Sequence, residues 1–590
     1  MTELLTGNTP EKWDEVKTHP FYAKMREALL ANGEEYLSSP VPSVPYTAYM
    51  RFLEDGNRSE YETPYRARRR RISELTVLTR LYGEKYLGAL CDTLWAVMDE
   101  STWALPAHIK EGFDDPYQRD TFLELGSTET GACMAECEMI LGDILPARVR
   151  VRMAAMIKER VIEPYFKHLY WWYNGSNNWG AVCCANVMLC IAYYGTEEQF
   201  FRAEPTMHET VTRFLASYGE DCCCLEGVSY WYYGFGYFVR YADTVRNYTR
   251  MHPSTPVAHT LISTPAREAK LYGTRPFVKD GVIDYFACDN VHRSALFAAN
   301  MRLKGECSVS FSDGPSKYSF RTSLLSYLKN EYPDDIFYPD MSLAELCVDD
   351  VRSWLWSDAD GVYGDRMKLG TVYYAEGAWF IRNAERFSFA AKGGCNAESH
   401  NHNDVGTFLI TTENGMSFAD LGSGEYTKQY FEPAHRYEHL VCASRGHSVP
   451  IINGEGQKIG NVCAAVETDK KDRFSVRFAH TYELASLRDL SRTFLCDEDG
   501  VTLTDTYLFD KAPTALAERF VSLRKPVLGQ GEVIVGDTAL RYDPSLFTVS
   551  VRCEEYSSHS RETVCAYLID LCPTHLAEQM TLCLRFDILT

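Results

Sequence analysis

The chain has 590 residues, of which 45% are hydrophobic and 24% charged, and its formal net charge is −21. So long a chain exceeds one ordinary hydrophobic core, so we expect two or more domains. The negative charge disfavours a nucleic-acid-binding protein, which would carry a basic surface. No apolar run is long enough to span a membrane, and the N-terminal residues lack the basic and apolar regions of an export signal. We therefore expect a cytoplasmic protein that does not enter a membrane.

Two compositional features need an interpretation. The 20 cysteines include the adjacent runs 183–184 and 222–224, and none has the spacing of a zinc ribbon, so we interpret them as small core residues. The basic run 66–71 leads directly into a helical pattern. We interpret this run mainly as a solvated helix face, with steering of an acidic substrate as the second possibility.

The apolar period is helical from the start to about residue 365. It is clearest at Leu75, Leu78, Leu81, Tyr82, Tyr86, Leu87, Leu90, Leu94, Trp95 and Met98. Similar patterns predict helices near 119–141, 147–166, 178–195, 197–217 and 232–248. Short connections between such helices are typical of antiparallel helical hairpins, as in bundles, solenoids or toroids, and periodicity does not choose among these.

After about residue 370 the apolar period changes to two. Phe474, Val476 and Phe478 alternate with polar residues, and other segments repeat the pattern up to the C-terminus. Glu413-Asn414-Gly415 lies between two strand-like runs and predicts a hairpin. Two stacked antiparallel sheets are the expected result. The sequence therefore predicts a helical domain over 1–370 and a β-sandwich over 371–590.

The block His400-Asn401-His402-Asn403-Asp404 is the first candidate for chemistry. If it is extended, His400, His402 and Asp404 project to one side, and two imidazoles so placed suit a transition metal or leave one free for proton transfer. Asp420 and His447 follow in the chain. A two-residue turn at Asn414-Gly415, however, would place Asp420 roughly 23 Å along an extended strand from His402. Spacing alone therefore does not establish a metal site.

Two further groups combine polar and aromatic residues. Asn177 and Asn178 follow the aromatic cluster 171–173, so they suit either helix capping or a site where rings stack on sugar faces. In the segment 226–234, Glu226 and Tyr230 share one face if the segment is helical. The aromatic residues of this segment suit a hydrophobic core equally well.

These motifs together resemble the heparinase II/III-type polysaccharide lyases. The resemblance rests on NNW at 177–179, EGVSYWYYG at 226–234, HNHNDVGTF at 400–408, ADLGSGEYT at 419–427 and RGHSVPIING at 445–454, with weaker similarity in WALPAH at 103–108 and the DGP turn at 313–315. It implies an incomplete α/α toroid followed by a β-sandwich. It also implies β-elimination on a uronate-containing, glycosaminoglycan-like polysaccharide or oligosaccharide, which leaves a C4–C5 unsaturated uronate.

The resemblance also implies catalytic roles. Asn177 and Asn178 would donate hydrogen bonds to the uronate carboxylate, and Asn178 stands where some family members have a histidine base. Tyr230 would protonate the leaving oxygen, and would abstract the C5 proton as well if its pKa were lowered. His400 would help to neutralise the carboxylate or act as the base for the other C5 epimer.

Metal and substrate contacts follow from the same resemblance. His402, Asp420 and His447 match a metal shell that is mainly structural and that we expect to hold zinc. The expected substrate-binding residues are His108, Trp179, Glu226, Tyr426, Tyr430 and Arg436.

Two other functions stay open. A glycoside hydrolase on an α/α-toroid scaffold would need two opposed carboxyl groups, and Glu226 is the only evident candidate. A non-catalytic glycan-binding protein on the same scaffold is the other alternative. A homo-oligomer is compatible with the sequence, which does not reveal the oligomeric state.

Overall fold

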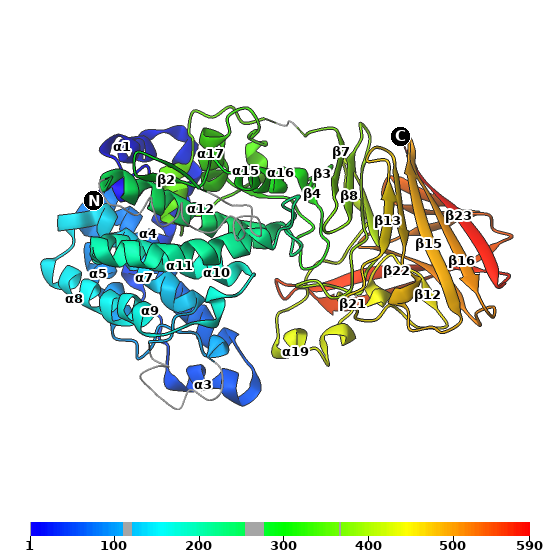
Figure 1. The fold of residues 1–590 in the computed structure, drawn as a ribbon, viewed down its shortest axis with the longest axis horizontal. Helices are drawn as coiled ribbons and strands as arrows, with labels where there is room; N and C mark the ends of the chain where they lie inside the picture. The colour runs from blue at the N-terminus through cyan, green and yellow to red at the C-terminus, as the bar shows by residue number, and fades with distance from the viewer. Residues whose placement is uncertain (1, 110–120, 254–275, 365–366, 590) are drawn as a thin grey trace. The chain divides into compact units, whose positions relative to one another are not determined.

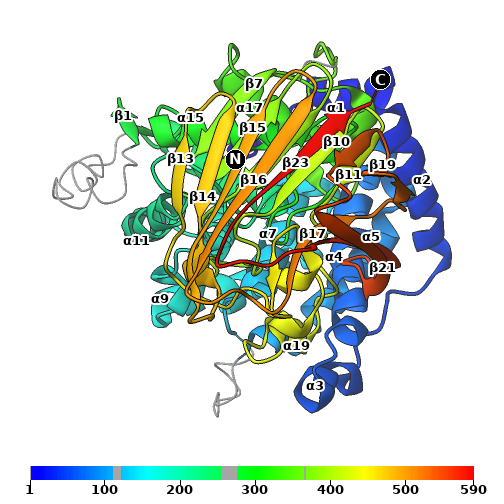
Figure 2. The same cartoon turned by 90° about the vertical axis from the view of Figure 1, so that its right-hand side faces the viewer.

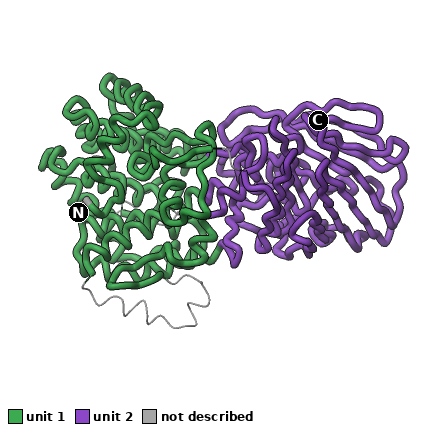
Figure 3. Tube along the Cα trace, turned by 90° about the horizontal axis from the view of Figure 1, so that it is seen from above, with its two compact units in different colours: residues 1–217, 232–295, 320–366 green, residues 218–231, 296–319, 367–590 purple. Residues whose placement is uncertain are grey.

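The structure is a computed structural model, and it describes residues 2–109, 121–253, 276–364 and 367–589 (Figure 1). The chain divides into two compact units (Figure 3). Unit 1 comprises 1–217, 232–295 and 320–366, and unit 2 comprises 218–231, 296–319 and 367–590. We predicted one boundary, between 370 and 371. The last change of unit lies close to it, but no sequence pattern predicted that two earlier segments, 218–231 and 296–319, belong to unit 2.

Unit 1 is mainly helical. Its helices are α1 (Pro10–Thr18), α2 (Ala23–Ser38), α3 (Tyr46–Asp55), α4 (Ser59–Tyr82), α5 (Leu87–Met98), α7 (Leu125–Leu141), α8 (Ala147–Ile157), α9 (Glu163–Lys167), α10 (Asn178–Tyr194), α11 (Glu197–Ala216), most of α12 (Val228–Met251), α15 (Asp289–Ala295), α17 (Thr322–Glu331) and α18 (Val351–Trp356). Short strands pair as β1 (Phe277–Lys279) with β2 (Val282–Asp284) and β5 (Phe320–Arg321) with β6 (Ala344–Glu345). Helix α10 packs against α7 and α11, and α4 packs against α5 and α7.

The helical prediction is confirmed where the period was clearest. The predicted helix 178–195 is α10, and the predicted helix 197–217 is α11. A capping box of Thr196 and Gln199 begins α11, because each side chain accepts a hydrogen bond from the backbone of the other residue. The predicted helix 147–166 is instead divided into α8 and α9 by a π-helical turn, Lys158–Ile162.

The basic run 66–71 is only in part the solvated face that we expected. Arg68 and Arg69 both bond to Glu100, whose side chain is 2% exposed. Arg71 is 4% exposed and donates to backbone carbonyls at the end of α2 and just beyond it. The interior of unit 1 therefore uses three of these arginines, whereas the side chains of Arg66 and Arg70 are exposed.

Unit 2 is mainly β. A five-stranded sheet of the described residues contains β7 (Gly370–Tyr374), β8 (Trp379–Asn383), β9 (Ser388–Lys392), β10 (Phe408–Thr412) and β11 (Gly415–Phe418). An eight-stranded sheet contains β13 (Ala465–Thr468), β14 (Arg473–Arg477), β15 (Leu487–Cys496), β16 (Gly500–Phe509), β18 (Val527–Gly529), β19 (Glu532–Val535), β20 (Thr538–Arg541) and β23 (Gln579–Ile588). A four-stranded sheet contains β12 (Ile451–Ile452), β17 (Leu516–Ser522), β21 (Phe547–Ser557) and β22 (Thr563–Pro573). Smaller elements of the unit are β3 (Arg302–Leu303), β4 (Cys307–Ser308), α16 (Phe297–Asn300) and α19 (Lys428–Phe431).

The sheets of unit 2 share one apolar core. Figure 2 shows β13, β14, β15, β16 and β23 side by side in the order that their pairing gives. Phe389 and Phe408 of the five-stranded sheet pack against Phe494 of the eight-stranded sheet. Such interdigitation across two sheets defines a β-sandwich, as the period of two predicted.

The hairpin at residue 414 forms with a different register from the one we expected. Thr412 pairs with Gly415, so the loop is Glu413-Asn414, and a bulge follows between Ile410 and Thr411. Gly415 has φ of 101°, a conformation that favours glycine. The predicted pair of strands is therefore correct, but the turn lies one residue earlier.

The cysteines also need one correction. Cys553 of β21 and Cys565 of β22 form a disulfide. Most other cysteines are buried, as expected of small core residues. Among the described residues, no helix combines the length and the apolar character needed to cross a bilayer.

Candidate active site

The block His400–Asp404 lies in the loop between β9 and β10 of unit 2. It is not extended, which was the condition for His400, His402 and Asp404 to project to one side. His400 has φ of 55°, in the left-handed region, and the backbone turns again where Thr407 donates to the carbonyl of Asp404. A non-glycine residue in this region costs about 1–3 kcal/mol and persists only where its surroundings hold it. A strained histidine in a polar loop is a signal of function.

The turns remove the geometric objection to a common site for His402 and Asp420. The ring of His447 lies 5.2 Å from that of His402, and its Nδ1 lies 3.0 Å from Oδ2 of Asp420. The roughly 23 Å separation applied only to an extended strand. All three side chains are fully buried in unit 2.

Asp313 joins the two histidines of the block. Nδ1 of His400 donates to Oδ2 of Asp313 at 2.6 Å, and Nε2 of His402 donates to Oδ1 at 3.1 Å. The Asp313 side chain is fully buried. Burial alone raises the pKa of this carboxyl group, but the hydrogen bonds from the two imidazoles outweigh burial and hold its pKa well below the usual range. Asp313 is therefore an ionised acceptor inside the protein.

Two tyrosines and an arginine complete the surroundings of Asp313. The hydroxyl of Tyr430 donates to Oδ1 at 2.5 Å, and that of Tyr426 donates to Oδ2 at 3.1 Å. The guanidinium of Arg436 lies 3.6 Å from Oδ2 and stacks 4.6 Å from the Tyr430 ring. We predicted substrate contacts for all three residues. Tyr430 is fully buried, so it supports Asp313 instead, whereas Tyr426 is only half-buried.

Tyr230 lies beside His400. It belongs to the first turn of α12, in the part of that helix assigned to unit 2, and its ring centroid is 4.4 Å from that of His400. Its hydroxyl lies 3.1 Å from that of Tyr426. Burial raises the pKa of Tyr230 well above its ordinary value. We had allowed for a lowered pKa and a tyrosinate base, but this environment favours a protonated hydroxyl.

Glu226 lies in the turn before α12, which begins at Val228, so it does not share a helical face with Tyr230 as the sequence suggested. Burial raises the pKa of its carboxyl group, and the charge of His400 opposes that shift. A carboxyl group with a raised pKa is suited to donating a proton or a hydrogen bond. Its predicted role as a substrate-binding residue stays a prediction.

The histidine pair has the arrangement expected of metal ligands. Nε2 of His447 donates to the carbonyl of Val441 at 2.8 Å, and Nε2 of His402 donates to Asp313, so Nδ1 of each ring is the nitrogen left for a metal. Nδ1 of His402 has no hydrogen-bond partner among the described residues. His402, Asp404 and His447 offer ligand atoms that lie within 4.8 Å of one another. The residues therefore fit a divalent ion of the zinc type.

Two carboxylates are candidates for the third ligand of this metal site. Asp420, which the resemblance named, has Oδ2 3.0 Å from Nδ1 of His447, and a metal bound between them would take the place of the proton that these two atoms share. Asp404, which we did not assign to a metal, has one oxygen 2.8 Å from Nζ of the buried Lys392, and its other oxygen has no partner within the described part of the chain. Either oxygen donor suits zinc alongside two imidazoles.

The other predicted residues lie in unit 1. Asn177 caps α10, because its side chain accepts a hydrogen bond from the backbone of Trp179 at 3.3 Å. Asn178 begins that helix and packs against Gly234 of α12. The ring of Trp179 lies 4.9 Å from His108, which is held by Glu124 and by Arg58. Trp179 and His108 therefore lie together in unit 1, while the capping role of Asn177 engages one of its polar atoms.

Solved lyases share this architecture. A mutant of heparan sulfate lyase HepC from Pedobacter heparinus matches with a TM-score of 0.57 and 11% identity, over 99% of this chain and 92% of the lyase. A heparinase III matches with a TM-score of 0.57 and 12% identity, over 100% and 93% of the two chains. A further heparinase III structure matches with a TM-score of 0.59 and 10% identity, over 99% and 92%. No protein-family model and no curated protein sequence matches the chain.

The chain has the heparinase III fold. The predicted architecture, an incomplete α/α toroid followed by a β-sandwich, is thereby confirmed, as is the resemblance to heparinase-type lyases at the level of fold. A shared fold at such low identity does not by itself assign an activity, which must be argued from the side chains of the site.

Within this heparinase III fold, unit 2 brings Tyr230 and His400 together as the motifs suggested. The residue that the sequence did not assign is Asp313, although its DGP turn was among the weaker similarities. Its partners lie 87 to 117 residues further along the chain. A single acidic residue in a turn gives no local signal of such partners.

Proposed function

We propose that this chain is a lyase that cleaves uronate-containing glycans by β-elimination. The observation that carries the proposal is the pairing of Tyr230 with His400, whose ring centroids are 4.4 Å apart in one unit. Elimination needs a base for the C5 proton and an acid for the leaving oxygen, and this pair supplies one of each. The heparinase III fold supports the same reaction class.

The steps follow from the two side chains. Nε2 of His400 takes the proton from C5, because its Nδ1 is committed to Asp313. The electron pair of the C5–H bond forms the C4–C5 double bond as the bond from C4 to oxygen breaks. The Tyr230 hydroxyl gives its proton to the leaving oxygen, and solvent then restores both groups. The products are a C4–C5 unsaturated uronate and a new free hydroxyl end.

The charge of the uronate carboxylate must be offset for the C5 proton to leave. Asn177 and Asn178 stay our predicted donors for that carboxylate. For sugar contacts we propose Trp179, His108, Glu226, Tyr426 and Arg436. These assignments follow the motifs, and no step above depends on them.

A bound zinc ion would be held by His402, His447 and a carboxylate from Asp404 or Asp420. It would supply charge neutralisation and a cross-link within unit 2. The protein residues then keep the loop in place, since His402 also donates to the carboxylate that orients His400. No proton passes through this group in the proposed reaction.

A glycoside hydrolase is the second candidate, because Glu226 has the raised pKa of a general acid. Hydrolysis would also need a second, reactive carboxyl group. Asp313 is the nearby acid, but its side chain is fully buried and both oxygens accept hydrogen bonds. It cannot approach a substrate, so the lyase reaction fits this site better.

One assay separates the candidates. The protein is incubated with heparan-type and chondroitin-type glycosaminoglycans, alginate and shorter uronate oligosaccharides. Ultraviolet absorbance then reports the new double bond, and a parallel assay counts reducing ends. We expect both signals to rise together. Reducing ends without absorbance would indicate hydrolysis, and binding with neither would indicate a glycan-binding protein.

Matched variants then test the residues. Tyr230→Phe and His400→Ala should each abolish most of the activity. Tyr482→Phe and His480→Ala are the controls, because Tyr482 donates only to the Pro450 carbonyl and His480 is exposed. Full activity in both site variants would overturn the site assignment even if the glycan is cleaved.

A further inference from the structure

We propose that Asp313 is the positioning residue of this site, and that it sets the tautomer of His400 and keeps Tyr230 in its protonated, proton-donating form. The inference rests on the proposed lyase function for its kinetic consequences. Its structural basis stands on contacts within unit 2 alone.

Asp313 determines where the protons of its hydrogen-bonding neighbours lie. An ionised carboxylate has no hydrogen to donate, so every group that hydrogen-bonds to it must donate. Nδ1 of His400 lies 2.6 Å from Oδ2 of Asp313 and therefore carries a proton. In the neutral ring this leaves the lone pair on Nε2, which is the nitrogen able to accept a proton from a substrate.

Asp313 also determines the role of Tyr230, through the hydroxyl of Tyr426. The hydroxyl of Tyr426 lies 3.1 Å from Oδ2 of Asp313, so its hydrogen points to that carboxylate. Its oxygen is then the acceptor in the 3.1 Å contact with the Tyr230 hydroxyl. Tyr230 must donate in that contact, which requires the protonated form. Asp313 thus makes Nε2 of His400 a proton acceptor and the hydroxyl of Tyr230 a proton donor.

The carboxylate of Asp313 does not react with the substrate itself. Oδ1 accepts from Nε2 of His402 and from the Tyr430 hydroxyl, and Oδ2 accepts from His400 and Tyr426. With four donors and no exposed surface, the carboxylate has no free position for substrate. Its effect is exerted only through the groups that it holds, which is what defines a positioning residue.

The backbone around Asp313 is fixed by close approach of two other site segments. A Cβ atom at Gly227, which has φ of 91°, would lie 3.1 Å from Cα of Gly314. A Cβ atom at Gly422, with φ of 62°, would lie 2.5 Å from the carbonyl oxygen of Gly314. Only glycine tolerates both the conformation and the contact. The segments that carry Tyr230 and Tyr426 therefore meet directly at the turn that carries Asp313.

The kinetic test uses Asp313→Asn, which keeps the shape and removes the charge. One side-chain atom becomes an amide donor, so at least one of the four present donors loses its acceptor. We expect kcat to fall by about 10²–10⁴, the range seen when a histidine loses the carboxylate that orients it, and KM to change less than about threefold. Asp243→Asn is the control, because Asp243 is an equally buried aspartate that pairs with Arg352 in unit 1. It should lower thermal stability without lowering kcat. Equal kcat in Asp313→Asn and wild type would overturn the inference.

A second measurement does not depend on activity. The ¹⁵N NMR signals of labelled histidines distinguish a protonated from an unprotonated ring nitrogen, and His400→Ala identifies the signals of His400 by their loss. In its neutral form, His400 should carry its proton on Nδ1 in the wild type and lose that preference in Asp313→Asn. A wild-type proton on Nε2 would overturn the inference. If no uronate is cleaved, the proposed function fails while this measurement still decides the role of Asp313.

Discussion

Nδ1 of His400 lies 2.6 Å from Oδ2 of Asp313, a residue 87 positions earlier in the chain. The contact forms because the short segment 296–319 belongs to unit 2, although unit 1 contains the residues on both sides of it. The carboxylate of Asp313, which lies in this segment, thereby contacts the loop between β9 and β10. The arrangement of the side chains in the candidate site depends on this contact as much as on the residues His400–Asp404 themselves.

Tyr430 supports the same carboxylate from the other side. Tyr430→Phe removes a hydroxyl that donates to an ionised, buried acceptor at 2.5 Å, and a hydrogen bond to a charged group contributes about 1.5–3 kcal/mol. We expect a loss of that size in the free energy of unfolding, measured by denaturant titration. Because His400 keeps its own contact with Asp313, kcat should fall less than in Asp313→Asn. Tyr482→Phe, which loses a bond to a neutral carbonyl, should cost about 1 kcal/mol. Equal losses in the two variants would contradict the charged environment described here.

The change of period from 3.6 to 2 near residue 370 predicted the two kinds of unit, because helix and strand burial impose those periods directly. The same approach failed in the loop at 400–404. We assumed an extended chain, whereas His400 adopts φ of 55°. Local patterns do not reveal such a turn, since it is held by contacts with Asp313 and not by propensity.

Whether a charged side chain is exposed or buried was similarly hard to predict from the sequence. The run 66–71 looked solvated because charged residues are usually exposed, but Glu100 lies behind it and buries Arg68 and Arg69 as ion pairs. Motif resemblance correctly grouped Tyr230 with His400. It gave no information on the pKa of Tyr230, which depends on burial that only the folded structure reveals.

Trp179 tests the predicted sugar contacts of unit 1. Its ring lies against His108 and 4.8 Å from Trp171, whose own side chain is 44% exposed. Trp179→Ala should raise KM, or the dissociation constant of a non-cleaved uronate oligosaccharide, by about tenfold, equivalent to about 1.4 kcal/mol. Titration calorimetry measures the dissociation constant. Trp95→Ala is the control, since Trp95 is a 37% exposed tryptophan that contacts Arg152. Unchanged binding in Trp179→Ala would remove this residue from the predicted set.

Glu204 predicts a pH dependence of the stability of unit 1. Burial raises the pKa of its carboxyl group to about 8, and one of its oxygens has no hydrogen-bond partner among the described residues. The folded state therefore holds a proton that the unfolded chain releases near pH 4.5. The stability that this protonated group contributes is complete below that value and is lost as the pH rises to about 8, by roughly 1.4 kcal/mol per pH unit.

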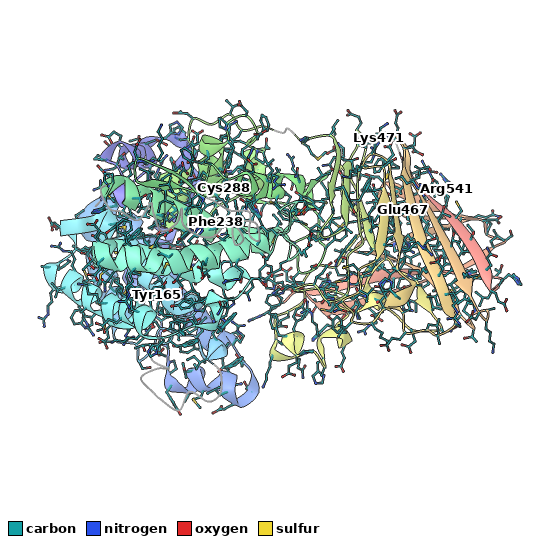
Figure 4. All side chains as sticks on the ribbon, in the orientation of Figure 1. Tyr165, Phe238, Cys288, Glu467, Lys471 and Arg541 are labelled. Atoms are coloured by element: carbon teal, nitrogen blue, oxygen red, sulfur yellow. A yellow bond between two sulfur atoms is a disulfide. The ribbon has the colours of Figure 1, made fainter. Side chains whose placement is uncertain are left out.

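Glu204→Gln removes this titration. The difference in unfolding free energy between variant and wild type should move in favour of the variant between pH 5 and pH 8, as measured by denaturant unfolding at several pH values. Glu467→Gln is the control, because Glu467 is an exposed residue of β13, labelled in Figure 4 among the strands of unit 2. A constant difference across this range would show that Glu204 ionises normally in the folded protein.

The metal prediction has the clearest stability readout. Burial alone lowers the pKa of His402, but Cys442 and Asp313 outweigh burial and raise it to about 10. A metal bound to His402 would therefore compete with a proton for the imidazole ring. We expect elemental analysis to find about one zinc ion per chain, and a chelator to lower Tm and to act more strongly as the pH falls.

Two substitutions assign the carboxylate ligand. Asp420→Asn should weaken zinc binding if Asp420 is the ligand that the resemblance implies, and Asp404→Asn should do so if the oxygen of Asp404 left free by Lys392 is the ligand instead. Loss of a ligand or of its hydrogen-bond partner weakens zinc binding by about 10–100-fold or more. Because no step of the proposed elimination passes through the metal, kcat per folded molecule should change far less than Tm. A zinc-free protein whose Tm does not change with the chelator would contradict the metal site.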